Sequence, residues 1–416
     1  MPSGSLPADG FSHNRVQYIE DPFPFYALMR EQSPAHWARE IFGGAWLMFR
    51  HEDCARLMQD ERLSNARADV PLRFLPPEQR DEFADLLGIY GRWLAFHDGK
   101  EHTRGRRLVN RGYAPFTDEH FEPRIQRIVD ELLDRVDPAG FDLIADFAFP
   151  LPAMVIADVL GVPVGVHQDL NRWTDDIAHL FGSTSVPVEH LYRTRESTRQ
   201  LAAFLASESS ARLSRAKGGL LHRLRQIEVR GSRLSEPDVV AQAALLLFAG
   251  VASIRYLIGN SVHALDSVPA TERELLLNPP TARPAVEELL RVCTPVSFVG
   301  RVAGSDFDYT ASDGTVVPLR EGQPLLLYIA SANRDPDVFD RPDELVLDRP
   351  LPNRHLTFGI GRHLCFGDPL VRQTTRIALS TLYTRWPELT VPPQEADWNN
   401  NLGFHGFTSL RVTGED

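Results

Sequence analysis

The chain has 416 residues, of which 43% are hydrophobic and 24% charged, an ordinary globular composition. Its 44 Lys and Arg against 56 Asp and Glu give a net charge of −12. This charge argues against nucleic acid as the main partner, because phosphate binding needs a basic surface. The three cysteines, Cys54, Cys293 and Cys365, lie far apart in sequence, which excludes a disulfide framework and fits a reducing cytoplasm.

The N-terminal segment and the apolar stretches predict a cytoplasmic chain without a membrane segment. Residues 1–24 are polar and interrupted by proline, unlike a secretory signal. The most apolar stretch, 239–258, contains polar residues, and its longest uninterrupted run is about half a membrane span. We therefore interpret this stretch as a buried core helix, and residues 1–14 as a flexible tail.

The predicted elements begin with a helix over 22–34, where Asp21 is placed to cap the helix and Pro22 fits its first position. A short strand at 46–49 and a helix at 52–59 follow. An irregular segment comes next, 62–95, with an apolar patch over 86–90. Further helical patterns cover 99–114, 118–136, 139–160, 166–181, two segments within 188–227, 235–266 and 282–293.

The last third of the chain carries the β portion. Short strand patterns cover 296–302, 315–317 and 324–329, followed by a long loop at 331–364, a helix at 366–386, and strands and turns to 413. No repeat or flexible linker divides the chain. The pattern predicts a mainly α fold with a small β portion, in a single domain spanning 1–416.

The 235–266 segment has the strongest helical pattern. Ser235 is placed to cap it, Pro237 lies in its first turn, and Asp238 completes a capping box. Because the segment is apolar nearly all round, we expect a central and fully buried helix.

The segment from Phe358 to Gly367, F-G-I-G-R-H-L-C-F-G, is the most informative in the chain. Its glycines permit tight turns and close backbone approach to a flat group. Cys365 precedes a helix, where the helix dipole and free amides stabilise a thiolate. Such a cysteine is an iron ligand or a nucleophile, although a lone cysteine beside a turn is more commonly buried and inert.

The complete pattern F-G-x-G-x-H-x-C-x-G resembles the haem-binding loop of the cytochrome P450 family at every specified position. The resemblance implies the cytochrome P450 fold, with haem b buried between the central long helix and the cysteine-loop helix. It also implies that Cys365 is the axial thiolate and metal ligand. Phe358, Gly361, His363 and Gly367 would complete the cofactor-binding loop.

Further motifs resemble the same family. Glu288 and Arg291 match its E-x-x-R pair, with Arg349 at the place of a third partner, and by resemblance they are structural. Alone, such a pair occurs on any exposed helix face.

Four cationic residues resemble the partners of the haem propionates. His102 and Arg106 are four residues apart on one helix face. Arg301 matches a strand arginine, and His363 is the fourth partner. Two carboxylates that enter a buried site need cationic, hydrogen-bonding groups of this kind.

The central helix departs from the family pattern, which reads Ala/Gly-Gly-x-Asp/Glu-Thr. Gly250 is expected to keep the groove where oxygen binds. Ala252 stands in the acid position and cannot carry a proton, whereas Ser253 replaces the threonine and can donate a hydrogen bond. We assign these three residues to the catalytic site. Arg255 is expected to face away from the haem, in a structural ion pair.

The substrate pocket is expected to be neutral and partly aromatic. Because Arg301 points to the haem, strand alternation would direct Val299 and Ser297 the same way. The predicted lining is Leu87, Ile89, Trp93, Val251, Ala252, Val296, Ser297, Val299 and Phe404. Such a lining favours a flat, aromatic natural-product intermediate over a fatty acid.

The resemblance implies an enzyme, a monooxygenase of secondary metabolism such as antibiotic biosynthesis, that hydroxylates or epoxidises its substrate. Haem with an axial thiolate activates O2, using electrons and protons. The missing acid leaves open oxidative C–C or C–N coupling or ring closure without oxygen insertion. Peroxide-driven oxidation and a non-catalytic haem sensor are lesser alternatives.

Electrons are expected from a separate ferredoxin and ferredoxin reductase, because the chain shows no flavin or iron–sulfur segment. Despite the net negative charge, a local basic patch would attract an acidic donor. The candidate residues are Arg104, Arg107, Arg362, Arg372 and Arg376.

Overall fold

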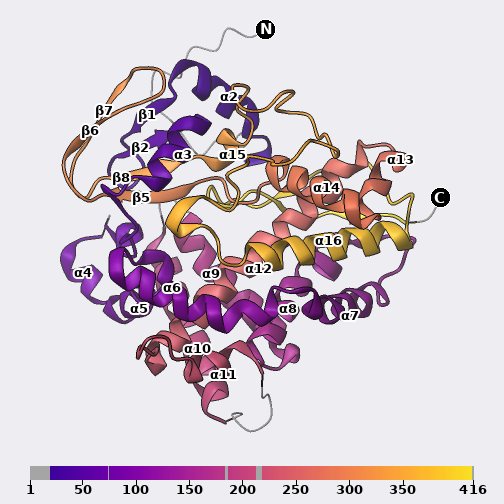
Figure 1. Ribbon diagram of the computed structural model, residues 1–416, viewed down its shortest axis with the longest axis horizontal. Helices are drawn as coiled ribbons and strands as arrows, with labels where there is room; N and C mark the ends of the chain where they lie inside the picture. Colours follow the sequence, from indigo (N-terminus) through magenta and orange to yellow (C-terminus); the bar gives the residue numbers. More distant parts are fainter. Residues whose placement is uncertain (1–18, 74, 183–185, 212–217, 415–416) are drawn as a thin grey trace.

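The computed structural model describes residues 19–73, 75–182, 186–211 and 218–414. Helices make up most of these residues, and the strands labelled in Figure 1 lie together in a smaller region at the upper left. The predicted mainly α fold with a small β portion is confirmed. The predicted flexible tail, 1–14, lies outside the described residues.

The predicted helices are present in order, with ends that shift by a few residues. The segment 62–95, predicted to be irregular, also contains helices, at Pro77–Asp81 and Ala84–Tyr90. The longer helices are α2 (Phe23–Gln32), α3 (His51–Gln59), α5 (Ala84–Tyr90), α6 (Gly99–Tyr113), α7 (Glu122–Leu133), α8 (Pro150–Leu160), α9 (His167–Gly182), α10 (Val188–Ala211), α11 (Leu220–Gln226), α12 (Glu236–Asp266), α14 (Pro279–Val292) and α16 (Asp368–Arg385). Shorter ones are α4 (Pro77–Asp81), α13 (Ala270–Arg273) and α15 (Ile329–Ala332). Pro22 takes the cap position of α2, and Asp21 accepts a hydrogen bond from the Phe23 amide at 3.2 Å.

The predicted helix over 139–160 is divided. A two-residue strand, β4 (Phe141–Asp142), leads into a π-helical turn, η5 (Leu143–Ala148), before α8 begins. Two prolines in the first turn of α8 lack the N–H groups that would continue the preceding hydrogen-bond ladder, so a new helix begins there.

The main sheet has five strands in the order β1-β2-β8-β5-β3. Its members are β1 (Ala35–Ala38), β2 (Ala45–Met48), β3 (Leu63–Ser64), β5 (Val299–Ala303) and β8 (Pro324–Leu327). The pairs β6–β7 (Phe307–Thr310, Val316–Leu319), β9–β10 (Asp397–Trp398, Phe407–Ser409) and β4–β11 (β11, Arg411–Val412) lie outside it. β1 and β3 are too short to show a period in the sequence. β1 pairs with the next strand, β2, whereas β3 pairs with the distant β5, and these pairings decide their conformation.

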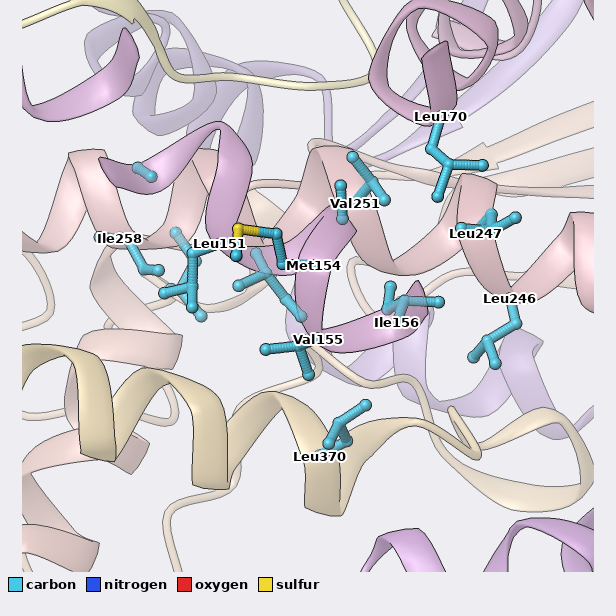
Figure 2. Packing of buried hydrophobic residues seen from close by; sticks show 14 of the residues in the cluster. Leu151, Met154, Val155, Ile156, Leu170, Leu246, Leu247, Val251, Ile258 and Leu370 are labelled. Atoms are coloured by element: carbon cyan, nitrogen blue, oxygen red, sulfur yellow. The ribbon is translucent and has the colours of Figure 1, made fainter. Parts of the chain in front are cut away.

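Helix α12 is the central helix. It has 31 residues and begins with the predicted capping box between Ser235 and Asp238. Figure 2 shows its side chains Leu246 and Val251 packed among residues of α8, with Leu370 of α16 nearby.

Two helical segments, 143–160 and α12, are long and apolar enough to match a membrane span by composition. Their most apolar windows are 72% and 67% buried inside the protein. That burial is the pattern of core helices, as expected for 235–266.

Candidate active site

The cysteine loop is closed by a backbone hydrogen bond and two left-handed glycines. The Cys365 amide donates to the Phe358 carbonyl at 2.9 Å. Gly359 and Gly361 have φ angles of 66° and 75°, a region that favours glycine. Gly361 opens a short 3-10 turn, η8 (Gly361–His363), and Gly367 caps α16. The loop therefore holds Cys365 just ahead of a helix.

Only one of the three cysteines is placed to bind a metal. Cys54 and Cys293 are buried, and their thiols donate to the carbonyls of Met48 and Asn260. Burial raises the pKa of Cys293 to about 12. Cys365 is partly exposed; burial raises its pKa, opposed by the Gly367 amide.

Imidazole and guanidinium side chains from three elements converge near this loop. The rings of His102 (α6) and His363 lie with their centroids 4.0 Å apart. Burial, with repulsion from His102 and Arg301, lowers the pKa of His363 to about 3, and burial lowers the pKa of Arg301 (β5) to about 10. Asp98 is the carboxylate nearest to His363, at 3.8 Å.

Arg106 lies at the thiol end of the same group. Electrostatic attraction links it to Cys365 and Asp368, and its guanidinium lies over the Phe366 ring at 5.8 Å. Two guanidinium groups and two imidazoles with so little counter-charge around them fit the two carboxylates of a haem as hydrogen-bond donors, next to a thiol that fits its iron.

A cavity of about 240 Å³ lies beside these cations. Most of its wall comes from five parts of the chain: residues 67–96, helix α9, helix α12, residues 296–301 and residues 403–404. Its lining is Phe42, Arg67, Val70, Pro71, Trp93, Ala95, Phe96, Phe181, Leu245, Phe248, Ala249, Val296, Phe298, Val299, Gly300, Arg301, Pro324, Leu326, Gly403 and Phe404.

Stacked aromatic rings form much of the cavity wall. Trp93 stacks on Phe248 with centroids 5.3 Å apart and on Phe96 at 5.7 Å. Phe181 contacts Phe248 at 5.4 Å, and Phe404 meets it edge-on at 6.4 Å. The cavity can therefore bind a flat ring between aromatic faces.

The family model for cytochrome P450 matches residues 271–412. The polyketide biosynthesis cytochrome P450 PksS of Bacillus subtilis (strain 168) is 31% identical, over 97% of this chain and 98% of the relative. The chain belongs to the cytochrome P450 family. Nocardicin C N-oxygenase of Nocardia uniformis subsp. tsuyamanensis is 34% identical, over 94% of this chain and 96% of that enzyme.

A solved cytochrome P450 structure confirms the fold. P450BioI, in complex with an acyl carrier protein ligated to hexadec-9Z-enoic acid, superposes with a TM-score of 0.85 and 29% identity. The alignment covers 96% of this chain and 99% of that one. This protein is therefore a cytochrome P450 oxidase whose cofactor is haem b with a cysteine thiolate ligand.

Within this cytochrome P450, the α12 wall differs from the prediction. Ala249 lines the cavity, and the Ser253 hydroxyl donates to its carbonyl at 2.7 Å, which places Ser253 on the same helix face. The predicted role of Gly250 in an oxygen groove stays a prediction, because the side of this glycine that lacks a Cβ faces α8. A Cβ at Gly250 would meet Cδ1 of Ile156 at 2.4 Å, so this glycine allows α8 to approach α12.

Ala252 is fully buried and packs with Ala178, Tyr256 and Phe404. Ala252 is absent from the cavity lining, although its neighbour Phe404 belongs to that lining. Arg255 forms the predicted ion pair, with Asp175 at 2.9 Å.

Four of the nine predicted pocket residues line the cavity. Trp93, Val296, Val299 and Phe404 do so. Leu87 and Ile89, by contrast, pack against the main core from helix α5.

Val251 and Ser297 were also wrongly assigned to the pocket. Val251 is fully buried among Leu170 and Ile156 (Figure 2). Ser297 is buried. Strand alternation could not predict its direction, because the β5 ladder begins only at Val299. The Ser297 amide instead donates to the Gly403 carbonyl at 3.0 Å.

Sequence reasoning missed Phe181, Phe248 and Arg67 as cavity residues. The two phenylalanines lie on helical patterns, where an aromatic residue is indistinguishable from core. Arg67 lies in an irregular segment, and no motif marked it. Only the folded chain brings it to Arg301.

The Glu288–Arg291 pair forms a buried network. Both side chains are 0% exposed, and they meet at 2.7 Å. Arg349 donates to the same carboxylate at 2.9 Å, as does Asn353 at 3.2 Å. The geometry agrees with the predicted structural role.

The predicted basic patch is only partly assembled. Arg104, Arg107 and Arg362 surround a concavity of about 370 Å³ together with Lys100 and Arg230. Arg372 and Arg376 do not line it and pair with Glu287 and Glu122. Within the concavity, Arg104 and Arg362 also pair with carboxylates, those of Glu101 and Glu61. The concavity therefore replaces the predicted patch as the basic surface beside the cysteine loop.

Proposed function

We propose that this cytochrome P450 is a cytoplasmic monooxygenase that hydroxylates or epoxidises a small aromatic intermediate of natural-product biosynthesis. The observation that carries the proposal is the cavity lined by stacked rings, bounded by Ser253's helix face on one side and by the cationic group on the other. A planar substrate fits between such rings. The names of relatives, a polyketide biosynthesis cytochrome P450 and a nocardicin C N-oxygenase, support the metabolic setting.

The chain's own residues would divide the work between two sides of the haem. Cys365 would ligate the iron, and His102, Arg106, Arg301 and His363 would hold the propionates. The bound haem supplies reductive activation of O2 and oxidation of the substrate. Trp93 and its aromatic neighbours would exclude water and orient the substrate ring.

The cavity wall offers few groups that could deliver protons. Among the described residues that line the cavity, none is Asp or Glu. The Ser253 hydroxyl donates to the Ala249 carbonyl, so its oxygen is free to accept a hydrogen bond from water or substrate. We infer that protons reach the site through ordered water or a substrate hydroxyl, held at Ser253.

A second candidate function is oxidative coupling or ring closure of an aromatic substrate without oxygen insertion. The same missing acid favours it, because Ala252 fills the acid position and is buried against Tyr256 and Phe404.

The proposed electron donor is a ferredoxin reduced by its reductase. Its docking surface would be the basic concavity of Arg104, Arg107 and Arg362. Charge complementarity of this kind speeds association and weakens with salt. A fall in electron-transfer rate with rising ionic strength, lessened in Arg107→Glu, would support this surface.

The first test is a Soret spin-shift titration of the ferric protein with aromatic and aliphatic ligands of matched size. We expect selective shifts with the aromatic ligands; selective shifts with aliphatic ligands would contradict the proposed substrate class. Products from a reconstituted reaction then separate the two functions, since hydroxylation adds one oxygen atom and coupling removes two hydrogen atoms. A parallel reaction with peroxide and no donor tests the peroxide-driven alternative, and gas binding without product would indicate a sensor.

Substitution of the cysteine tests the haem assignment separately. Cys365→Ser is expected to abolish the thiolate-ligated carbonyl spectrum, while Cys293→Ser retains it. Retention of that spectrum in Cys365→Ser would overturn the assigned ligand.

A further inference from the structure

The cavity holds a cation that the proposed function does not use. Arg67 lines the cavity, and its Nε donates to the Gly300 carbonyl at 2.9 Å. Arg301 donates to the same carbonyl oxygen at 2.8 Å. Two guanidinium groups therefore converge on one oxygen atom.

No acid neutralises this pair. Arg67 has no carboxylate within ion-pair distance among the described residues, and the cavity lining contains no Asp or Glu. Asp98 attracts both arginines from further away, but its oxygens already accept from Ser64 and the Asn65 amide. Burial and repulsion from Arg301 lower the pKa of Arg67 to about 9, so it remains charged at neutral pH.

The position of Arg67 also fixes the kind of ligand. Its guanidinium lies over the Phe96 ring at 4.8 Å, and Phe96 stacks on Trp93. Its two terminal nitrogens donate no hydrogen bond to the described residues. A planar fork of free N–H donors matches a carboxylate, and the adjoining rings match an aromatic body.

We propose that Arg67 binds a carboxylate in the cavity, and that the substrate is accordingly an aromatic acid. The inference deepens the proposed function and rests on it. A haem propionate is the other source of the same chemistry, because Arg301 is assigned to the propionates. The aromatic surroundings of Arg67 favour the substrate.

The test uses holoenzyme and ligands whose binding is visible in every variant. Imidazole-bearing aromatic acids of increasing tether length ligate the haem iron through nitrogen, and each is paired with its neutral amide. Binding is read from the Soret shift. Wild type is expected to favour at least one acid over its amide, and Arg67→Leu to lose about 10- to 100-fold in affinity for that acid only. Arg67→Lys is expected to restore part of the loss, because it keeps the charge without the fork.

The matched control is Arg62→Leu, which removes one positive charge from the same segment outside the cavity, where Arg62 pairs with Asp60. It should leave every acid-to-amide ratio unchanged. A second arm measures the rate of haem transfer to apomyoglobin. Faster haem loss in Arg67→Leu with unchanged ratios would assign Arg67 to a propionate and overturn the substrate role. Unchanged ratios and unchanged haem loss would overturn carboxylate binding altogether.

These outcomes are distinct from failure of the proposed function. If products show no oxidation of aromatic substrates, the proposed reaction fails, whereas the acid-to-amide ratios still report on Arg67. If oxidation occurs but the ratios do not respond to Arg67, the carboxylate inference alone fails.

Discussion

The E-x-x-R region and the cavity wall both bury a guanidinium, but they surround it differently. Arg291 donates to Glu288 at 2.7 and 2.8 Å, and its remaining N–H groups reach three backbone carbonyls. Arg67 donates to one carbonyl, which it shares with a second arginine. Both side chains are charged, but among the described residues Arg291 pairs with a carboxylate and Arg67 has none within ion-pair distance.

This difference distinguishes a buried arginine that stabilises the fold from one that is available to bind a ligand. A buried charge is costly unless it is paired and fully hydrogen-bonded, and the Arg291 network meets both conditions. The Arg67–Arg301 pair meets neither, so an anion supplied from outside the polypeptide would stabilise it. Removing a residue should therefore damage folding in the first region and ligand binding in the second.

Arg291→Ala is expected to give the largest effect. It leaves the fully buried Glu288 carboxylate with one arginine, Arg349, and should lower the free energy of unfolding by about 3–5 kcal/mol. Urea unfolding measures the change. The control is Arg62→Ala, which removes an exposed ion pair with Asp60 and should leave the free energy of unfolding as in wild type. Equal stability of both variants would refute the structural reading of the network.

The neighbouring Glu287 predicts how acid weakens the same region. Burial opposes its ionisation, but hydrogen bonds from His355 and Arg372 outweigh burial and lower its pKa to about 2. An unfolded glutamate titrates near pH 4.5, so this pairing stabilises the fold above that pH. The contribution is lost as the pH falls from about 4.5 to 2.

Glu287→Gln should therefore be less stable than wild type at neutral pH, with a shallower loss between pH 4.5 and 2. Thermal unfolding followed across this pH range measures both features. Parallel curves for the two proteins would contradict the assigned pKa shift.

Arg67→Met should have a smaller effect on stability than Arg291→Ala. It removes one hydrogen bond to Gly300 but also a charge that burial disfavours, so the free energy of unfolding should change by less than about 1 kcal/mol. The measurement is urea unfolding of the holoenzyme without ligand. A loss as large as that of Arg291→Ala would make Arg67 a structural residue and remove the contrast between the regions.

Ala252→Asp adds a carboxylate next to Phe404 of the cavity, whose lining contains no Asp or Glu. We expect haem binding to persist and the ratio of product to uncoupled peroxide to change, because an acid then stands one residue from Ser253. Ala252→Asn is the control of equal size. An identical ratio in all three proteins would mean that the position does not communicate with the proton path.

Local sequence patterns predicted the structure of the cysteine loop well and the lining of the cavity only partially. The cysteine loop is continuous in sequence, so its glycines, Cys365 and the following helix could be placed from spacing and helix-end chemistry. The cavity is assembled from segments far apart in the chain. Periodicity places a residue on one face of its own helix or strand, but it does not say which neighbour covers that face.

The failed predictions follow from that limit. Ser297 was placed by extending strand alternation beyond the residue where the β5 ladder begins. Phe181 and Phe248 carry the same periodic signal as core residues, so nothing local separated them from the hydrophobic interior.

The sequence by itself determined the mainly α fold, the capped central helix and the cysteine loop, because each depends on neighbours a few residues apart. It also showed that Ala252 replaces the acid of the family's central-helix pattern. Only the tertiary structure decided that Arg67 meets Arg301 at one carbonyl oxygen, and that this pair lies beside stacked rings. Charge balance inside a protein depends on which distant groups share a site, and spacing along the chain does not specify that.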